Sequence, residues 1–180
     1  MKHHVHCKVI AGFVAILCSA ILVGCATCKP GDPGMPRKYD IEVNLDDSLK
    51  NSSVVVDLVG INSAGLARWQ AYDMEKYWVD GDPMRQDASK VTFDFVTDST
   101  LKRTLSMTNS IWATWQDKGV DHVMVLANLP VTAASLPGNQ DVRRQVLSLG
   151  VCHWPDKTTQ LRVSVKRSGI EVLTPARSSK

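Results

Sequence analysis

Short segments in which apolar and polar residues alternate recur along this chain of 180 residues. In residues 41–45 and 161–166 every second side chain is apolar, a period typical of a strand with one buried and one exposed face. Other segments of strand-like composition lie at 54–59, 91–95, 120–127, 146–154 and 170–173. Seven or eight short strands in a chain of this size predict a mainly β fold, a β-sandwich with one or two short helices.

Some segments depart from the strand pattern. From Ser63 onward bulky side chains recur every three or four residues, and Ser63 can cap the first turn. The segment Asp80-Gly81-Asp82-Pro83 stops this pattern, so the sequence predicts a helix over residues 64–78. A second short helical turn is expected at 139–145. Residues 101–115 fit either a helix or two strands, and we prefer two strands.

The predicted helix carries four aromatic side chains: Trp69, Tyr72, Tyr77 and Trp78. Bulky side chains on one helical face usually dock the helix on a core. Tryptophan and tyrosine are also favoured anchors at protein interfaces. The four residues are therefore either core residues or a partner-binding surface, and they are the candidate binding residues of this chain.

The amino terminus has the pattern of an export signal. Lys2 and Lys8 accompany an apolar run over residues 9–23, which is shorter than the roughly 20 residues that span a bilayer. The run ends in Leu22-Val23-Gly24-Cys25, which resembles the lipobox of bacterial prolipoproteins. In that family the cysteine thiol receives a diacylglyceryl group, the preceding peptide is removed, and the new amino terminus is usually acylated as well.

The resemblance implies that an acylated Cys25 anchors the protein in a membrane without a transmembrane helix. Two or three long acyl chains hold a protein on a bilayer for practical purposes permanently. The residue after the cysteine is Ala26 rather than aspartate, which in this family implies sorting to the outer membrane, with the protein facing the periplasm.

The mature chain is expected to hold one domain. Residues 26–38 contain three prolines and two glycines, which oppose both helix and sheet. We expect a signal peptide at 1–24, a lipidated cysteine and flexible tether at 25–38, a β-sandwich at 39–173 and a tail at 174–180.

The charge of the mature chain is close to zero. Removal of residues 1–24 takes away Lys2 and Lys8 and leaves 19 basic and 18 acidic residues. A nucleic-acid-binding domain shows clustered lysine and arginine, so this class is not expected. The pairs Arg143-Arg144 and Lys166-Arg167 are short and typical of solvated faces.

The sequence contains no complete catalytic or metal-binding motif. The segment Ser99-Thr100-Leu101-Lys102 matches S-x-x-K but lacks the partner motifs of penicillin-recognising enzymes. After signal removal only His122 and His153 remain, and neither has a second ligand at a recognised spacing. We expect no catalytic residue, no metal ion, no cofactor and no nucleotide site.

Two cysteines remain free after Cys25 is acylated. Cys28 and Cys152 would lie in a compartment where disulfides persist, and they could pair. The bridge would fold the tether back onto the domain. Alternatively, Cys152 is a small buried residue that shares a strand face with Val146 and Trp154.

Several of these features together resemble the small outer-membrane lipoprotein of type VI secretion systems. They are the lipidated cysteine and short tether, a valine-rich strand ending near Leu58, an aromatic segment after it, and closing strands at 147–151 and 161–165 with Gly169-Ile170. That family has a transthyretin-like β-sandwich and anchors the system's inner-membrane trunk through the trunk protein's periplasmic domain. The resemblance covers about residues 40–173.

The sequence therefore predicts a non-enzymatic, outer-membrane-anchored lipoprotein that binds another envelope protein. A tether for a type VI secretion trunk is its most concrete version. The alternative is a lipoprotein that holds a small apolar ligand or a cell-wall glycan, and a hydrolase ranks third.

Overall fold

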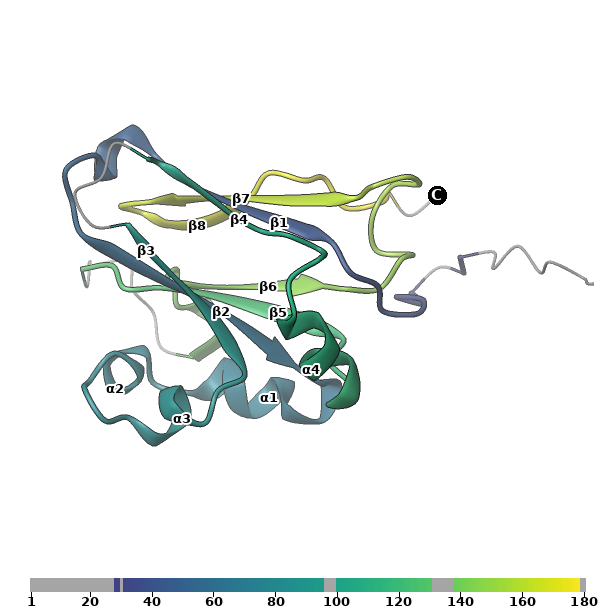
Figure 1. Cartoon of the computed structure of the whole chain (residues 1–180), viewed down its shortest axis with the longest axis horizontal. Helices are drawn as coiled ribbons and strands as arrows, with labels where there is room; N and C mark the ends of the chain where they lie inside the picture. Colours follow the sequence, from purple (N-terminus) through teal and green to yellow (C-terminus); the bar gives the residue numbers. More distant parts are fainter. Residues whose placement is uncertain (1–27, 30, 96–99, 131–137, 179–180) are drawn as a thin grey trace, which may run out of the picture.

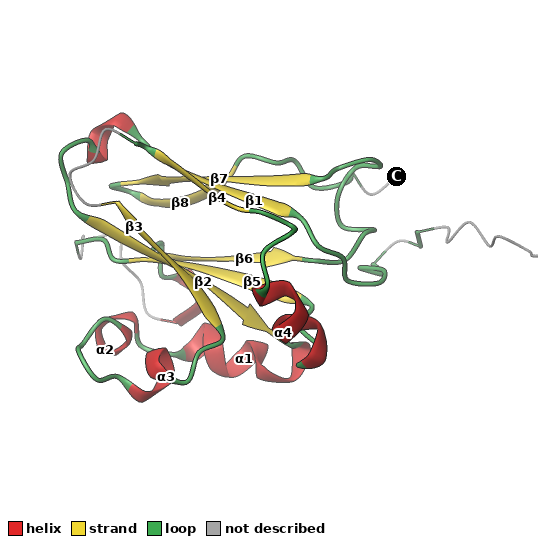
Figure 2. Ribbon diagram, viewed as in Figure 1, coloured by secondary structure: helices red, strands yellow, loops and turns green. Residues whose placement is uncertain are grey.

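The predicted β-sandwich is confirmed. A computed structural model describes residues 28–29, 31–95, 100–130 and 138–178, and these form two sheets of four strands each (Figures 1 and 2). The first sheet has the order β4 (Lys102–Leu105), β1 (Asp40–Leu45), β7 (Gln160–Lys166), β8 (Gly169–Val172). The second has the order β3 (Lys90–Phe95), β2 (Val54–Ile61), β5 (His122–Ala127), β6 (Arg144–Ser148).

Strand pairing follows the alternation of the sequence. β1 runs parallel to β7, and this register places Ile41 beside Leu161 and Val43 beside Val163. All four side chains are fully buried between the sheets. On the facing sheet Val56 belongs to the same core cluster, so alternate residues of both sheets fill the space between them.

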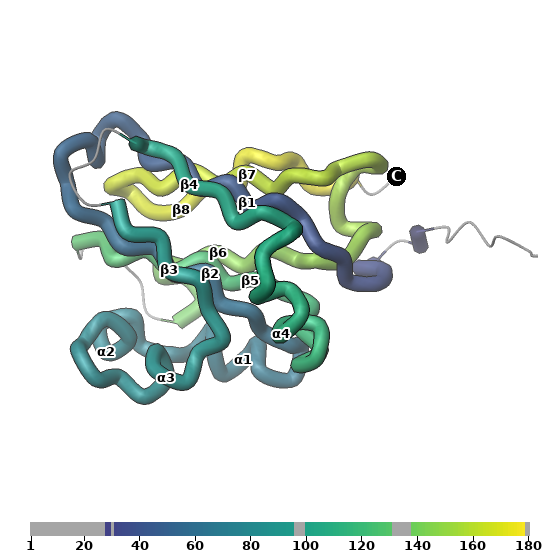
Figure 3. The backbone as a smooth tube through the Cα atoms, viewed as in Figure 1, coloured from purple at the N-terminus to yellow at the C-terminus, as the bar shows by residue number. Residues whose placement is uncertain are grey.

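A third layer of short helices covers the outer face of the second sheet, as the tube in Figure 3 shows most plainly. It consists of α1 (Ser63–Ala71), α2 (Met74–Tyr77) and α3 (Pro83–Gln86), which connect β2 to β3. The single helix predicted over residues 64–78 is thus wrong. It breaks because the Asp73 carboxylate accepts hydrogen bonds from the backbone N–H groups of Glu75 and Lys76 and starts α2.

The other helical expectations are also corrected. Asn62 rather than Ser63 caps α1, because its side-chain oxygen accepts from the Gly65 N–H at 3.0 Å. The turn expected at 139–145 is a 3₁₀ turn, η2 (Gly138–Gln140), and a further 3₁₀ turn, η1 (Asp47–Leu49), follows β1.

Residues 111–117 form helix α4 (Ile111–Asp117) and not the strand preferred from the sequence. An apolar run of this length does not distinguish strand from helix by its period alone. Trp112 and Trp115, three residues apart, are both buried at one end of the sandwich and pack edge to face with their ring centroids 4.9 Å apart. The Trp112 indole N–H donates to the Ser106 carbonyl oxygen at 2.9 Å, and the Trp115 indole N–H donates to the Ser89 carbonyl oxygen at 3.0 Å.

Gly60 in β2 makes room for this helix. A Cβ atom built on Gly60 would lie 2.5 Å from the Trp115 Nε1, a distance that atoms in contact do not reach. The strand and the helix therefore fit each other only with glycine at this position.

We expect Trp115→Ala to lower the free energy of unfolding by about 3 to 5 kcal/mol, because it leaves a cavity and removes a buried hydrogen bond. Urea denaturation followed by circular dichroism measures the loss. Thr114→Ala, at an exposed position of the same helix, is the matched control and should stay within about 0.5 kcal/mol of wild type. Equal stability of the two variants would show that α4 does not close the core.

Candidate functional site

The outer face of the second sheet, like its inner face, is largely apolar. Val59 and Ile61 of β2 and Met124 and Leu126 of β5 form a second buried cluster, which the helical layer covers with Met74 and neighbouring side chains. Burial on both faces explains why residues 54–59 are almost continuously apolar.

A charged group of β2 also lies in this face. The carboxylate of Asp57 in β2 is completely buried and accepts three hydrogen bonds from side chains. The donors are the Tyr77 hydroxyl at 2.9 Å, the Arg85 Nε at 2.9 Å and the Thr92 hydroxyl at 2.6 Å. A buried carboxylate is costly unless it is paired and hydrogen-bonded, so this group fixes α2 and α3 on the sheet.

Tyr77 is a core residue, which corrects its assignment as a partner-binding candidate. Its side chain is fully buried, and burial, followed by the negative charge of Asp57, raises the pKa of its hydroxyl. Trp69 and Trp78 pack against its ring at centroid distances of 6.0 and 5.1 Å. Tyr77 thus packs against two of the other three candidates, Trp69 and Trp78.

The remaining three candidates, Trp69, Tyr72 and Trp78, are half-buried. The Arg85 guanidinium lies 4.6 Å from the centroid of the Trp78 ring. The Tyr72 hydroxyl donates to Asp82 at 2.6 Å, a hydrogen bond that raises the pKa of the tyrosine. Each aromatic side chain is therefore held in place while part of its surface stays accessible.

A hollow of about 370 Å³ opens between α1 and α3. We call it the helical hollow, and its lining combines aromatic, apolar and charged side chains: Arg68, Trp69, Tyr72, Pro83, Met84, Asp87 and Ala88. Val79, in the loop before α3, is 61% exposed. Apolar surface rimmed by charge is typical of protein interaction sites.

Two arginines that look solvated in the sequence are buried and hold the helical layer in place. The Arg144 guanidinium donates to the carbonyl oxygens of Trp69, Gln70 and Tyr72 at the carboxyl-terminal end of α1. Arg143 bonds Asp141 and Glu75, and the hydrogen bond with Asp141 raises the pKa of this arginine. Sequence reasoning missed both roles, because a pair of adjacent arginines carries no signal of burial.

At one end of the sandwich the structure joins Cys28 to Cys152 in a disulfide with a Cα–Cα distance of 5.3 Å. β6 ends at Ser148, so Cys152 lies in a turn and not on the strand expected over residues 146–154. The bridge spans 124 residues of sequence.

Part of the predicted tether belongs to the folded domain. Residues 33–37 run along residues 149–152 with three backbone hydrogen bonds, between Cys152 and Pro33 at 2.9 Å, Arg37 and Leu149 at 3.0 Å, and Val151 and Met35 at 3.1 Å. A Cβ atom at Gly150 would lie 2.1 Å from the Pro33 carbonyl oxygen, so the two segments approach closely only because this residue is glycine.

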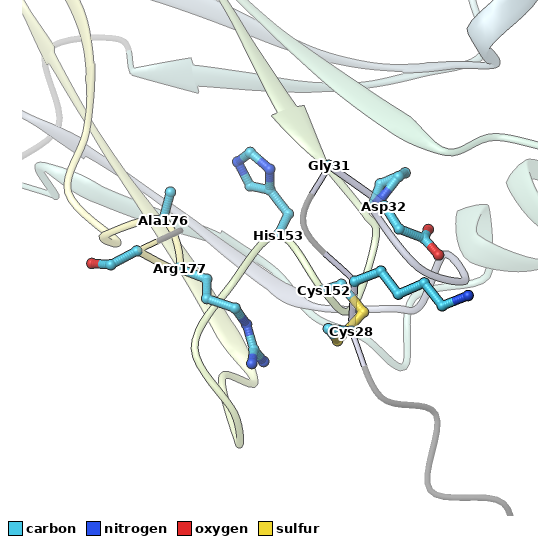
Figure 4. A pocket seen from close by; sticks show the side chains of 10 residues that line it. Cys28, Gly31, Asp32, Cys152, His153, Ala176 and Arg177 are labelled. Atoms are coloured by element: carbon cyan, nitrogen blue, oxygen red, sulfur yellow. A yellow bond between two sulfur atoms is a disulfide. The ribbon is translucent and has the colours of Figure 1, made fainter. Parts of the chain in front are cut away.

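We call this end of the molecule the disulfide pole: residues 28–29, 31–38, 149–159 and 174–178 (Figures 1 and 4). The Arg177 N–H donates to the His153 carbonyl at 2.8 Å and brings the carboxyl-terminal segment to the bridge. Around the disulfide lies an open hollow of about 520 Å³. Partial burial lowers the pKa of His153, one of its lining residues.

Cys25 and the lipobox resemblance lie outside the described residues, as does Ser99 of the S-x-x-K match. No helix of the described part is long and apolar enough to cross a membrane. The described residues also contain no cluster of three or more side chains suited to a metal ion.

One polar cluster superficially resembles a hydrolase site. Asp121 accepts hydrogen bonds from the Ser63 hydroxyl and pairs with the His122 Nδ1 at 2.7 Å. In a serine hydrolase the histidine lies between serine and carboxylate and takes the serine proton. Here the carboxylate lies between the other two, so the cluster does not have the geometry of an activated nucleophile.

Comparison with known proteins gives structural likeness only, since no family model and no curated protein sequence matches the chain. The fold is similar to that of Serratia marcescens Lip, a membrane-bound component of the type VI secretion system, with a TM-score of 0.51 and 11% identity over 79% of this chain and 100% of Lip. A chain of a type VI membrane complex has a TM-score of 0.47 at 11% identity, over 77% of this chain and 99% of that one.

The type VI secretion lipoprotein TssJ1 of Pseudomonas aeruginosa has a TM-score of 0.43 and 14% identity, over 81% of this chain and 99% of TssJ1. The likeness to Lip shows a shared fold.

For protein exported without acylation, with Cys25 changed to serine, we expect no titratable thiol in denaturant and two after reduction. Cys28→Ser and Cys152→Ser should each lower the free energy of unfolding by about 3 kcal/mol, because the bridge closes a long loop. The double variant should lose no more than either single variant, since one substitution already breaks the bond. Additive losses would mean that the two thiols act separately.

Proposed function

We propose that this chain is an outer-membrane-anchored lipoprotein that faces the periplasm and serves as a binding module in an envelope protein complex. Two independent observations support the proposal. The sequence before Cys25 resembles a lipobox, and the folded domain shares its fold with Lip, a membrane-bound component of a secretion system. The first bears on the anchor and the second on the kind of complex.

We infer further that the complex is a type VI secretion system and that the chain tethers the trunk of this system to the outer membrane. The sequence resemblance to the lipoprotein of such systems and the likeness of fold to Lip support the same assignment.

The single observation that most favours protein binding is the helical hollow. Of its two aromatic side chains, Trp69 packs against the buried Tyr77 ring and Tyr72 donates a hydrogen bond to Asp82, and both remain partly accessible. Rigid aromatic groups in a shaped depression are the usual anchors of interfaces. The alternative of a ligand between the sheets has less support, because buried side chains of both sheets fill that space.

Anchoring depends on the Cys25 thiol in this proposal. We expect that protein with Cys25→Ser, exported behind a cleavable signal that does not direct acylation, appears in the soluble fraction. Cys18→Ser in the natural signal is the matched control and should leave the protein in the membrane fraction, because Cys18 lies in the removed peptide. If the Cys25→Ser protein stays in the membrane pellet after a salt wash, the anchor lies elsewhere.

Partner binding depends on the helical hollow. We expect Arg68→Glu to abolish capture of the trunk protein from detergent-solubilised envelope while the melting temperature stays within about 2 °C of wild type, because Arg68 is exposed. Trp69→Ala should have the same effect on capture with a loss of stability. Arg162→Glu, the same charge change on the exposed face of β7, is the control and should bind normally.

Quantitative mass spectrometry of the captured proteins measures the outcome. Wild-type capture by both folded hollow variants would place the interface elsewhere on the domain. Failure of wild type itself to capture a trunk protein would refute the assignment to a type VI secretion system.

A further inference from the structure

The disulfide pole differs from the rest of the mature protein in charge. It contains five basic and two acidic side chains, a net charge of +3, while the mature chain as a whole has 19 basic and 18 acidic residues. The remainder of the mature protein is therefore slightly acidic. The positive charge is concentrated at one end, where two of the basic groups are already engaged.

The engaged groups are Arg37, which bonds the Thr158 carbonyl and lies 4.8 Å from the Tyr39 ring centroid, and Arg177, which pairs with Asp156. The other three, Lys29, Lys38 and Lys157, are exposed and form no ion pair with any described residue. The pole thus presents three ammonium groups to whatever lies beside it.

The pole also carries the most exposed large apolar side chain of the described residues. Met35 is 79% exposed and lies between Pro33 and Pro36 on the segment that is bonded to residues 149–152. An exposed apolar side chain on a positively charged surface is a common arrangement where a protein contacts a lipid interface.

Covalent geometry limits how far this pole can be from the acylated residue. Cys28 is fixed to the domain by its disulfide, and it follows Cys25 by only three positions in the sequence. Three residues span at most about 10 Å, compared with about 40 Å for an unpaired tether reaching to residue 38. The Debye length at physiological ionic strength is about 8 Å, similar to this reach, so the Cys28 end of the pole lies within electrostatic range of the headgroups.

We propose that the disulfide pole is a membrane-contact surface, in which Lys29, Lys38 and Lys157 bind anionic phospholipid headgroups and Met35 enters the headgroup region. This inference rests on the proposed anchoring through Cys25. It adds an orientation: the pole faces the bilayer, and the helical layer stands at the side of the sandwich, free for a protein partner (Figure 1).

The first test separates the surface from the acyl anchor. Soluble Cys25→Ser protein is sedimented with vesicles of phosphatidylethanolamine and phosphatidylglycerol in about a 3:1 ratio, or with phosphatidylcholine alone. We expect salt-sensitive binding to the anionic vesicles only. Lys29→Gln combined with Lys38→Gln should weaken it about 25-fold, at about fivefold for each lysine, and Met35→Ser about fivefold. Lys157 is not substituted, because its backbone φ of +69° lies in the sparsely populated left-handed region and a change there would perturb the turn itself.

The matched control is Lys50→Gln combined with Lys76→Gln, which removes the same charge from exposed positions outside the pole and should leave binding unchanged. Equal loss in both pairs would mean that only net charge matters and would overturn the proposal. So would a failure of the wild-type protein to bind anionic vesicles, which would instead leave the pole as a surface for an acidic protein.

The second test uses the lipidated protein on the same two kinds of vesicle. Hydrogen exchange of residues 33–38 and 151–157 should be several-fold slower on anionic vesicles than on phosphatidylcholine, and that of α1 should not change. Unchanged exchange at the pole in protein that sediments fully with its vesicles would refute the surface and leave the anchor intact. Release of the protein from the vesicles would refute the anchor itself.

Discussion

The helical layer depends on one buried carboxylate. Asp57 lies on the central strand β2 among apolar side chains, where an unpaired charge would be very unfavourable. Its three partners come from α2, α3 and β3, so the charge is satisfied only when all three elements are in place. The same partners position the candidate surface, because Tyr77 packs against Trp69 and Arg85 covers Trp78.

The strands of the sandwich could be predicted because one physical rule governs them. In β1 and β7 every side chain that points between the sheets is apolar. A shift of the pairing by one residue would turn these side chains to the other face, so burial determines the register. The helices were harder, because local and tertiary effects compete there. Residues 111–117 became a helix since Trp112 and Trp115 fill the end of the core, a requirement that no local pattern contains.

The candidate site could be predicted only in part. Its aromatic composition was visible in the sequence, but burial separates Tyr77 from the other three residues, and burial depends on the partner sheet. The role of Arg144 depends on carbonyl oxygens more than 70 residues away, and that of Arg143 depends in part on the Glu75 carboxylate, 68 residues away. Sequence spacing reveals neither contact. Pairing of Cys28 with Cys152 likewise depends on a close approach that Gly150 allows.

The disulfide also determines how the domain would carry a mechanical load. A pull from the membrane would enter at Cys28 and pass through a covalent bond directly to Cys152, in the turn that follows β6. Residues 33–37 and the start of β1 would be bypassed, so their hydrogen bonds would not open one after another under tension. A tether built in this way can be short and still transmit force into the interior of both sheets.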